Sequence, residues 1–310
     1  MSQLLTHTFI TAFIVAWLAG AMPLMLAAVG ETIGEQSGVL NLGIEGTMLV
    51  GGYFSYVAAL HTHSLWLGML AGGIMGALLT SVLVILSVWF GLNQIVIGIA
   101  VTLLGGGTTA VLFYSNYSQS TPRVPPATWN IPGLSDIPIL GKSVFNQHGI
   151  FWVSILLMVV VSWLLTRTNW GLSVKAAGQK PLSLDAAGGS VMRTRSEAEL
   201  LAGFFGGLGG AYLALIATSA FTPFMTAGLG YIAIIVTMLS RGKIYLVAIV
   251  ALIYGLSVAS GTVLQLTALN VPTDLISMLP YLVVMAMLLV FARSVYIPPA
   301  LAAPYTRGAR

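Results

Sequence analysis

Cysteine is absent from this sequence of 310 residues, and charged residues make up only 6% of it. The lack of cysteine excludes disulfide bonds, a thiolate nucleophile and an iron–sulfur centre within these residues. Because a soluble domain carries about 25% charged residues, so few charges cannot cover the surface of a water-soluble chain of this length. The composition therefore excludes an ordinary soluble globular protein.

Apolar residues dominate instead, at 57% of the chain, and the mean hydropathy is +0.96. We expect an all-α polytopic membrane protein with about nine transmembrane or half-membrane helices, in a single transmembrane domain covering residues 1–310. The seventh segment is too short for a simple crossing, which favours a half-helix or a re-entrant piece. The expected segments are residues 9–29, 40–60, 65–90, 93–114, 150–165, 199–218, 229–240, 244–266 and 276–292.

The basic residues predict the orientation in the membrane. The net charge of +4 is spread along the chain, so a nucleic-acid surface is not expected. With the amino terminus outside and the carboxyl terminus inside, ten Lys and Arg residues fall on the inner side and two on the outer side. This predicts an extracytoplasmic loop at 114–149, a cytoplasmic loop at 167–199 and a cytoplasmic tail at 293–310. The inner set is Arg167, Lys175, Lys180, Arg193, Arg195, Arg241, Lys243, Arg293, Arg307 and Arg310, and the outer set is Arg123 and Lys142.

The cytoplasmic loop contains a candidate short helix. The letters LSLDAA can form one short amphipathic helix, which Gly188 and Gly189 would end. A short exposed helix between two membrane helices could act as a lever on the bundle, and a simple surface connector is the commoner alternative in membrane proteins.

Glycine recurs at four-residue intervals in two of the expected spans. Gly68, Gly72 and Gly76 share one helix face, and Gly203 and Gly207 share another. Small residues at this spacing allow helix backbones to approach closely. We interpret both stripes as packing faces, with a role in lining a solute path as the less common alternative.

The stretch SGVLNLGIEGTMLVGGYF carries Glu45, the only acidic residue that we place within an expected span and not at its first position. Burying it costs roughly 3 kcal/mol unless it is paired or hydrated. On a continuous helix Asn41 and Glu45 would share a face, whereas a helix broken at the glycines would let the carboxylate accept bonds from backbone N–H groups. We favour this structural role over direct solute contact. A later stretch, FMTAGLGYIAIIVTML, resembles it weakly and is compatible with an inverted internal repeat.

Catalytic motifs are missing from the sequence. Neither H-E-x-x-H nor G-x-S-x-G occurs, and His61 and His63 alone are too few for a zinc site. The letters GKS at 141–143 lack the preceding glycine of a phosphate loop, because Asp136 stands at that position. We expect no catalytic residue and no metal, so any nucleotide energy must come from another chain.

Three runs resemble the permease subunits of bacterial ABC importers in the branched-chain amino acid and ribose transport superfamily. These runs are GETIGEQSGVLNLGIEGTMLVGGYFSY, the inner loop from GLSVKAAGQKPLSLDAAGGSV onward, and FTPFMTAGLGYIAIIVTML. They follow one another in the family's order, and NLGIEG is most similar to the nucleoside and simple-sugar branch. The sequence departs from the family's pattern at TMLSRGK, where Arg241 and Lys243 interrupt the apolar run expected for the seventh segment.

The resemblance implies a location in the lipid bilayer of the bacterial inner membrane. It also implies three protein partners: a second homologous permease, a cytoplasmic ATP-binding subunit that holds ATP and Mg, and an extracytoplasmic solute-binding protein. No cofactor is expected in this chain. The family's glycine-rich signature falls on Asn41, Gly43, Glu45 and Gly46. Its ATPase-coupling helix falls on Lys180, Pro181, Leu182, Ser183, Leu184, Asp185, Ala186, Ala187 and Gly188.

The expected function is therefore the permease subunit of an ATP-driven ABC importer, which moves a small polar solute by alternating access and is not itself an enzyme. A nucleoside or simple sugar is favoured over a branched-chain amino acid. Tyr53, Asn93 and Gln94 are candidate path residues because such solutes need stacking and hydrogen bonds, although each type is more often a packing residue. A secondary transporter or a channel without an ATPase partner is the alternative.

Overall fold

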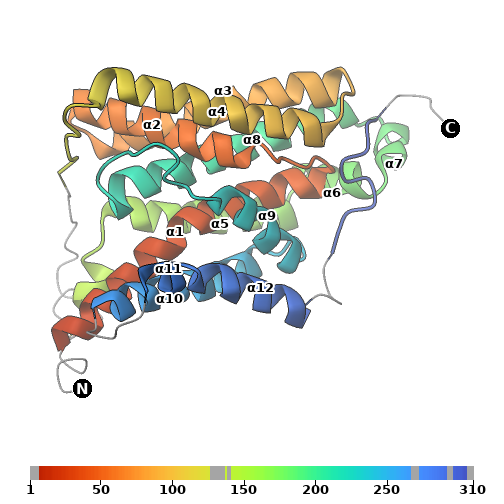
Figure 1. Ribbon diagram of the computed structural model, residues 1–310. Helices are drawn as coiled ribbons and strands as arrows, with labels where there is room; N and C mark the ends of the chain where they lie inside the picture. Colours follow the sequence, from red (N-terminus) through yellow and green to blue (C-terminus); the bar gives the residue numbers. More distant parts are fainter. Residues whose placement is uncertain (1–6, 126–136, 138–140, 267–271, 292–295, 306–310) are drawn as a thin grey trace.

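The computed structural model describes residues 7–125, 137, 141–266, 272–291 and 296–305. These residues form a helical bundle without a β-strand among them (Figure 1). The helices are α1 (His7–Ser37), α2 (Ile44–Thr62), α3 (Leu65–Leu83) with its π-helical extension η2 (Val84–Trp89), α4 (Gln94–Tyr117), η3 (Gly141–Phe145), α5 (Gly149–Arg167), α6 (Asn169–Gln179), α7 (Pro181–Ala186), α8 (Val191–Tyr212) with η4 (Leu213–Ala217), α9 (Leu229–Leu239), α10 (Ile244–Leu266), α11 (Thr273–Ser277) and α12 (Leu279–Phe291).

The centre of the bundle is α8, which packs against α1, α2 and α3. The two predicted glycine stripes meet there. A Cβ atom built on Gly76 would lie 2.5 Å from the carbonyl oxygen of Gly203 and 2.7 Å from the Cα of Gly207. A Cβ on Gly72 would lie 2.8 Å from the carbonyl oxygen of Gly51. Only glycine leaves room for helix backbones this close, so α2, α3 and α8 form one tightly packed unit.

A helix is present in each of the nine segments expected from the sequence, but not all nine are long, apolar crossings. Seven helices of the described residues have the length and apolar composition to span a membrane. The other two are α2, with 19 residues and a more polar sequence, and α9, with 11 residues. The number of crossings and the inverted repeat stay predictions. The short seventh segment is α9, which ends at Leu239 before a turn that leads to α10.

Two helices extend beyond their predicted ends, and this corrects the placement of acidic residues. The first helix continues past residue 29 to Ser37, and α8 begins at Val191 instead of 199. Glu31, Glu35 and Glu199 therefore lie inside helices and are buried, so Glu45 is not the only acidic residue within the bundle. The extended end of α1 packs on α8: a Cβ on Gly34 would lie 2.6 Å from Oε2 of Glu199. Hydropathy alone could not register that contact.

The start of α1 and residues 296–305 lie at opposite ends of the bundle (Figure 1). Helices α6 and α7 lie at the same end as residues 296–305. Those last residues fold back on the bundle, where the backbone N–H of Ala300 donates to Gly178 and that of Ala302 to Gly38. Which membrane side each end faces stays a prediction. Parts of the predicted outer loop and inner tail lie outside the described residues, at 126–136, 138–140, 292–295 and 306–310.

Candidate functional site

The predicted surface lever is a separate short helix, α7, between α6 and α8 at one end of the bundle (Figure 1). Pro181 occupies its first turn, where the missing N–H of proline costs no hydrogen bond. Gly188 follows the helix with a φ of 83°, a left-handed conformation that glycine adopts without strain. The sequence thus places a proline at the start and a glycine just after the end of the helix.

The two leucines of α7 have different surroundings. Leu184 is buried and packs in a small cluster with Ala177 of α6 and Val191 of α8. Leu182 is 57% exposed and points away from the chain's own core. Leu184 therefore anchors α7 to its neighbours, whereas Leu182 offers an apolar side chain that another protein could cover. The sequence suggested the helix but treated these two leucines alike.

Glu45 joins α2 to the start of α9. Its Oε1 accepts a hydrogen bond from the hydroxyl of Thr226 at 2.6 Å and from the backbone N–H of Gly228 at 2.8 Å. Its Oε2 accepts from the backbone N–H of Gly230 at 2.6 Å. The N-cap residue of α9, Gly228, has no side chain to satisfy these first N–H groups. A carboxylate from another helix caps α9 instead, and it complements the positive end of the helix dipole.

Close packing supports this arrangement on both sides of Glu45. A Cβ on Gly230 would lie 2.6 Å from the Cα of Glu45, and one on Gly46 would lie 2.6 Å from the carbonyl oxygen of Val101 in α4. Residues 38–43 are not helical and α2 begins at Ile44. Of the two arrangements considered for Asn41 and Glu45, the broken helix is the one observed, so the two side chains do not share a helix face.

Three buried carboxylates form a second group that sequence reasoning missed. Glu31 accepts a hydrogen bond from the backbone N–H of Asn41 at 3.3 Å, and Glu199 lies 2.6 Å from the position of a Cβ on Gly34. Neither oxygen of Glu199 has a hydrogen-bond partner among the described residues. The signal in the sequence was the spacing of Glu31 and Glu35, four residues apart and directly after an apolar run.

Arg195, one helical turn before Glu199, ties the ends of several segments together. Its guanidinium donates to the carbonyl oxygens of Ser37 at 3.2 Å, Ala303 at 2.8 Å and Ala177 at 3.3 Å. Arg195 is 2% exposed. The side chain thus joins α8 to the end of α1, the end of α6 and the returning tail at residues 296–305.

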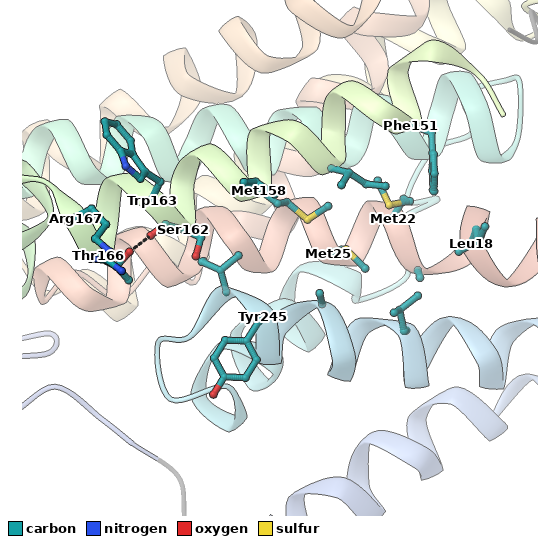
Figure 2. A pocket seen from close by; sticks show the side chains of 16 residues that line it. Leu18, Met22, Met25, Phe151, Met158, Ser162, Trp163, Thr166, Arg167 and Tyr245 are labelled. Carbon is teal, nitrogen blue, oxygen red and sulfur yellow. Dashed lines mark hydrogen bonds between the residues drawn. The ribbon is translucent and has the colours of Figure 1, made fainter. Parts of the chain in front are cut away.

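The three candidate path residues do not come together. Tyr53 is buried in α2, with its ring 5.3 Å from that of Phe221 in an edge-on contact. Asn93 is exposed and caps α4, and Gln94 accepts a hydrogen bond from the backbone N–H of Leu40 at 2.9 Å. None of the three lines the cavity of Figure 2. Their observed contacts are structural, and a role in solute passage stays a prediction.

His148 is a further residue whose role the sequence did not indicate. It is the N-cap of α5, and its Nδ1 accepts a hydrogen bond from the backbone N–H of Ile150 at 3.0 Å. Burial lowers the pKa of His148 below its ordinary value of 6.5. The neutral imidazole is therefore the form that caps the helix, since a protonated Nδ1 cannot accept a bond.

A cavity of about 540 Å³ lies between α1, α5 and α10 (Figure 2). Most of its lining is apolar, and its few polar side chains gather at one end. Such a surface lacks the distributed hydrogen-bonding groups that would bind a sugar or a nucleoside. Elsewhere in the described residues, no group of three or more His, Asp or Glu side chains is arranged to hold a metal ion.

Comparisons with known proteins give a consistent result. The family model for the permease component of branched-chain amino acid transport systems matches residues 13–290. The guanosine ABC transporter permease protein NupQ of Bacillus subtilis is 31% identical over 309 residues, covering 95% of this chain and 96% of the relative. The nucleoside ABC transporter permease protein NupC of Lactococcus lactis is 28% identical over 291 residues, covering 90% and 91%.

A third relative comes from an archaeon. The putative glucose ABC transporter permease protein TsgC13 of Haloferax volcanii is 33% identical over 251 residues, covering 80% of this chain and 76% of the relative. No solved structure matches. The similarity to relatives therefore extends over most of the chain, including α2, α7 and α9.

Proposed function

The chain belongs to the family of permease components of branched-chain amino acid transport systems, and from this we propose that it is the membrane subunit of an ATP-driven importer for a nucleoside or a simple sugar. The observation that carries the proposal is the similarity along nearly the whole chain to NupQ, whose name gives guanosine as its solute. The sugar alternative rests on TsgC13, and a branched-chain amino acid on the family's description.

In this proposal α7 is the contact with a cytoplasmic ATP-binding subunit. The exposed Leu182 would enter a pocket of that subunit, while Leu184 fixes α7 to α6 and α8. A push on α7 would reach the ends of α1 and α6 through Arg195, which hydrogen-bonds to both. ATP binding and hydrolysis in the partner would thereby change the packing of the bundle and open the solute path alternately to each side, with no chemical change in the solute.

The proposal includes three further components: a second, homologous permease that completes the path, an extracytoplasmic binding protein that delivers the solute, and Mg with ATP in the partner subunit. The two permeases would lie in the bacterial inner membrane, with the binding protein on its outer side and the ATP-binding subunit on its inner side. The seven long apolar helices among the described residues, together with the related ABC permeases, indicate a multi-pass membrane protein.

Glu45 has a structural role in the proposal. A carboxylate that accepts three hydrogen bonds has little capacity left for a solute, and its bonds hold α9 in place at a break in the membrane helices. The junction of α2 with α9 would then be a fixed point about which the surrounding helices rearrange.

A secondary transporter is the second candidate, and one observation favours it. Such proteins use buried ionisable groups to couple solute movement to ions or protons, and Glu31, Glu35 and Glu199 are buried carboxyl groups of that kind. Glu31 and Glu35 lie within the last two turns of α1, about 9 Å and 3 Å along the axis from its end at Ser37, and Glu199 of α8 lies beside them. This position near one end, beside the Arg195 contacts, is more consistent with a structural junction than with a mid-membrane ion site.

One experiment separates the two candidates. The chain is isolated in mild detergent from its native membrane, the co-purifying proteins are identified, and the assembly is reconstituted in vesicles with its binding protein. Uptake of guanosine, glucose and leucine is then measured with ATP and with a non-hydrolysable analogue. We expect an ATP-binding subunit to co-purify and uptake to require hydrolysis. Uphill accumulation by this chain alone, driven by an ion gradient, would establish a secondary transporter instead.

A further inference from the structure

The cavity between α1, α5 and α10 has a polarity gradient along its length. Its apolar part is formed by side chains such as Met22, Phe151 and Met158, and its polar side chains Ser162, Thr166, Arg167 and Tyr245 gather at the opposite end (Figure 2). The stretch of α5 from Phe151 to Arg167 covers about 24 Å at 1.5 Å per residue. That length is comparable with the ~30 Å hydrocarbon core of a bilayer, so the groove runs along most of the membrane depth.

The groove opens sideways from the bundle. Val159, Trp163 and Tyr245 line it and are 60%, 57% and 60% exposed. A path for a polar solute would be enclosed and lined by hydrogen-bonding groups, whereas a sideways opening between apolar side chains faces the lipid.

A second cavity, of about 420 Å³, continues the polar end. Both cavities are lined by Ser162, Thr166, Ile244 and Tyr245. The second adds Lys175 of α6 and the pair Arg241 and Lys243 from the turn between α9 and α10. Together with Arg167 of α5, four cations from three elements surround the polar end.

Among the residues that the structure describes, no acidic side chain lines either cavity beside these cations. The salt bridge found among the described residues joins Arg193 to Glu197, away from both cavities. A concentration of uncompensated positive charge at one end of an apolar groove is complementary to a molecule with an anionic head and a hydrocarbon tail. Basic pockets between membrane helices on the cytoplasmic side are known to hold anionic headgroups.

We propose that this groove is a binding site for an anionic phospholipid of the inner leaflet. One acyl chain lies between α5 and α10 over α1, and the phosphate lies among Arg167, Lys175, Arg241 and Lys243. The inference uses the proposed orientation of the membrane but does not depend on the transported solute. A lipid bound there would bridge α5, α6 and the α9–α10 turn, all of which pack near the end that carries α7.

The test measures lipid retention by the assembled transporter in mild detergent, using native mass spectrometry with phosphatidylglycerol and phosphatidylcholine of identical chains. The wild type is expected to retain phosphatidylglycerol selectively. The double variant Arg241→Asn and Lys243→Gln should reduce retention about 25-fold, from roughly fivefold per charge. Asparagine is chosen at position 241 because the residue has a φ of 52°, which asparagine tolerates. The matched control Arg193→Gln removes an exposed cation that lines neither cavity and should retain the lipid.

A second pair of variants tests the acyl chain. Ala248→Trp fills the apolar part of the groove, and Ile249→Trp places the same side chain at a neighbouring position that does not line it. Only the first should reduce retention, and Ala248→Leu is used if the larger change prevents assembly. Equal retention of the two lipids, no effect of filling the groove, or complete release by excess inorganic phosphate would overturn the proposal. The proposal would also be overturned if the assembled transporter retained neither lipid and the second permease could be crosslinked to Tyr245, because the second permease would then occupy the groove.

Discussion

Replacing Glu45 by glutamine tests the cap that joins α2 to α9. The side-chain amide keeps one oxygen, which can still accept from Thr226 and Gly228, but its NH₂ group faces the N–H of Gly230 and cannot accept. That buried donor is left unsatisfied, at a cost of about 1–3 kcal/mol, and the other two bonds weaken by about 0.5–2 kcal/mol each as the charge is lost. Removing the buried charge returns roughly 3 kcal/mol, so the middle of these ranges gives a net loss of about 1.5 kcal/mol.

This loss corresponds to a decrease in Tm of roughly 3–6 °C, which differential scanning fluorimetry in detergent can measure alongside ATP-driven uptake in vesicles. Uptake by the folded fraction should be nearly normal if Glu45 is structural. The control Thr226→Val removes one donor to the same carboxylate and should cost about 1 kcal/mol. An unchanged Tm together with loss of uptake would refute the reasoning, because it would place Glu45 on the solute path or in the gate.

Three other changes test separate parts of the structure. Leu182→Ala should weaken binding of the ATP-binding subunit, measured by pull-down, without changing Tm. Leu184→Ala should lower the free energy of unfolding by about 2–3 kcal/mol, measured by thermal denaturation, because only Leu184 is buried. Gly76→Ala should reduce the folded yield seen by size-exclusion chromatography, because its Cβ would lie 2.5 Å from a carbonyl oxygen, while Gly107→Ala, with open space around it, should not. His148→Asn should remove part of the loss of Tm on acidification, because asparagine caps α5 without titrating.

The direction of the pH effect follows from the lowered pKa of His148. Below about pH 6.5 the unfolded chain binds a proton at this residue before the folded chain does, so stability falls as the pH decreases towards the folded-state pKa and is fully present above pH 6.5. A Tm that rises on acidification in this range would contradict the assignment. Equal Tm losses for the Leu182 and Leu184 variants, or equal yields for the two glycine variants, would contradict the packing described for α7 and for α3 with α8.

The sequence by itself determined the class of protein and the positions of its helices. Few charges, long apolar runs and regular glycine spacing report on local composition and periodicity, which decide whether a segment is stable in lipid. The short helix α7 was also predictable, because a proline at its start and a glycine after its end are local signals. The family resemblance, which the comparisons confirm, was carried by runs of letters in their order along the chain.

Only the tertiary structure decided which polar groups meet. Glu45 lies 181 residues before Thr226, and nothing local to either residue predicts that the carboxylate caps α9. The burial of Glu31, Glu35 and Glu199 likewise depends on the contact between α1 and α8, which extends both helices beyond their apolar runs. The four cations at the polar end of the groove between α1, α5 and α10 come from α5, α6 and the α9–α10 turn. Hydropathy is a sum over neighbours in sequence, whereas capping, desolvation and charge complementarity depend on neighbours in space.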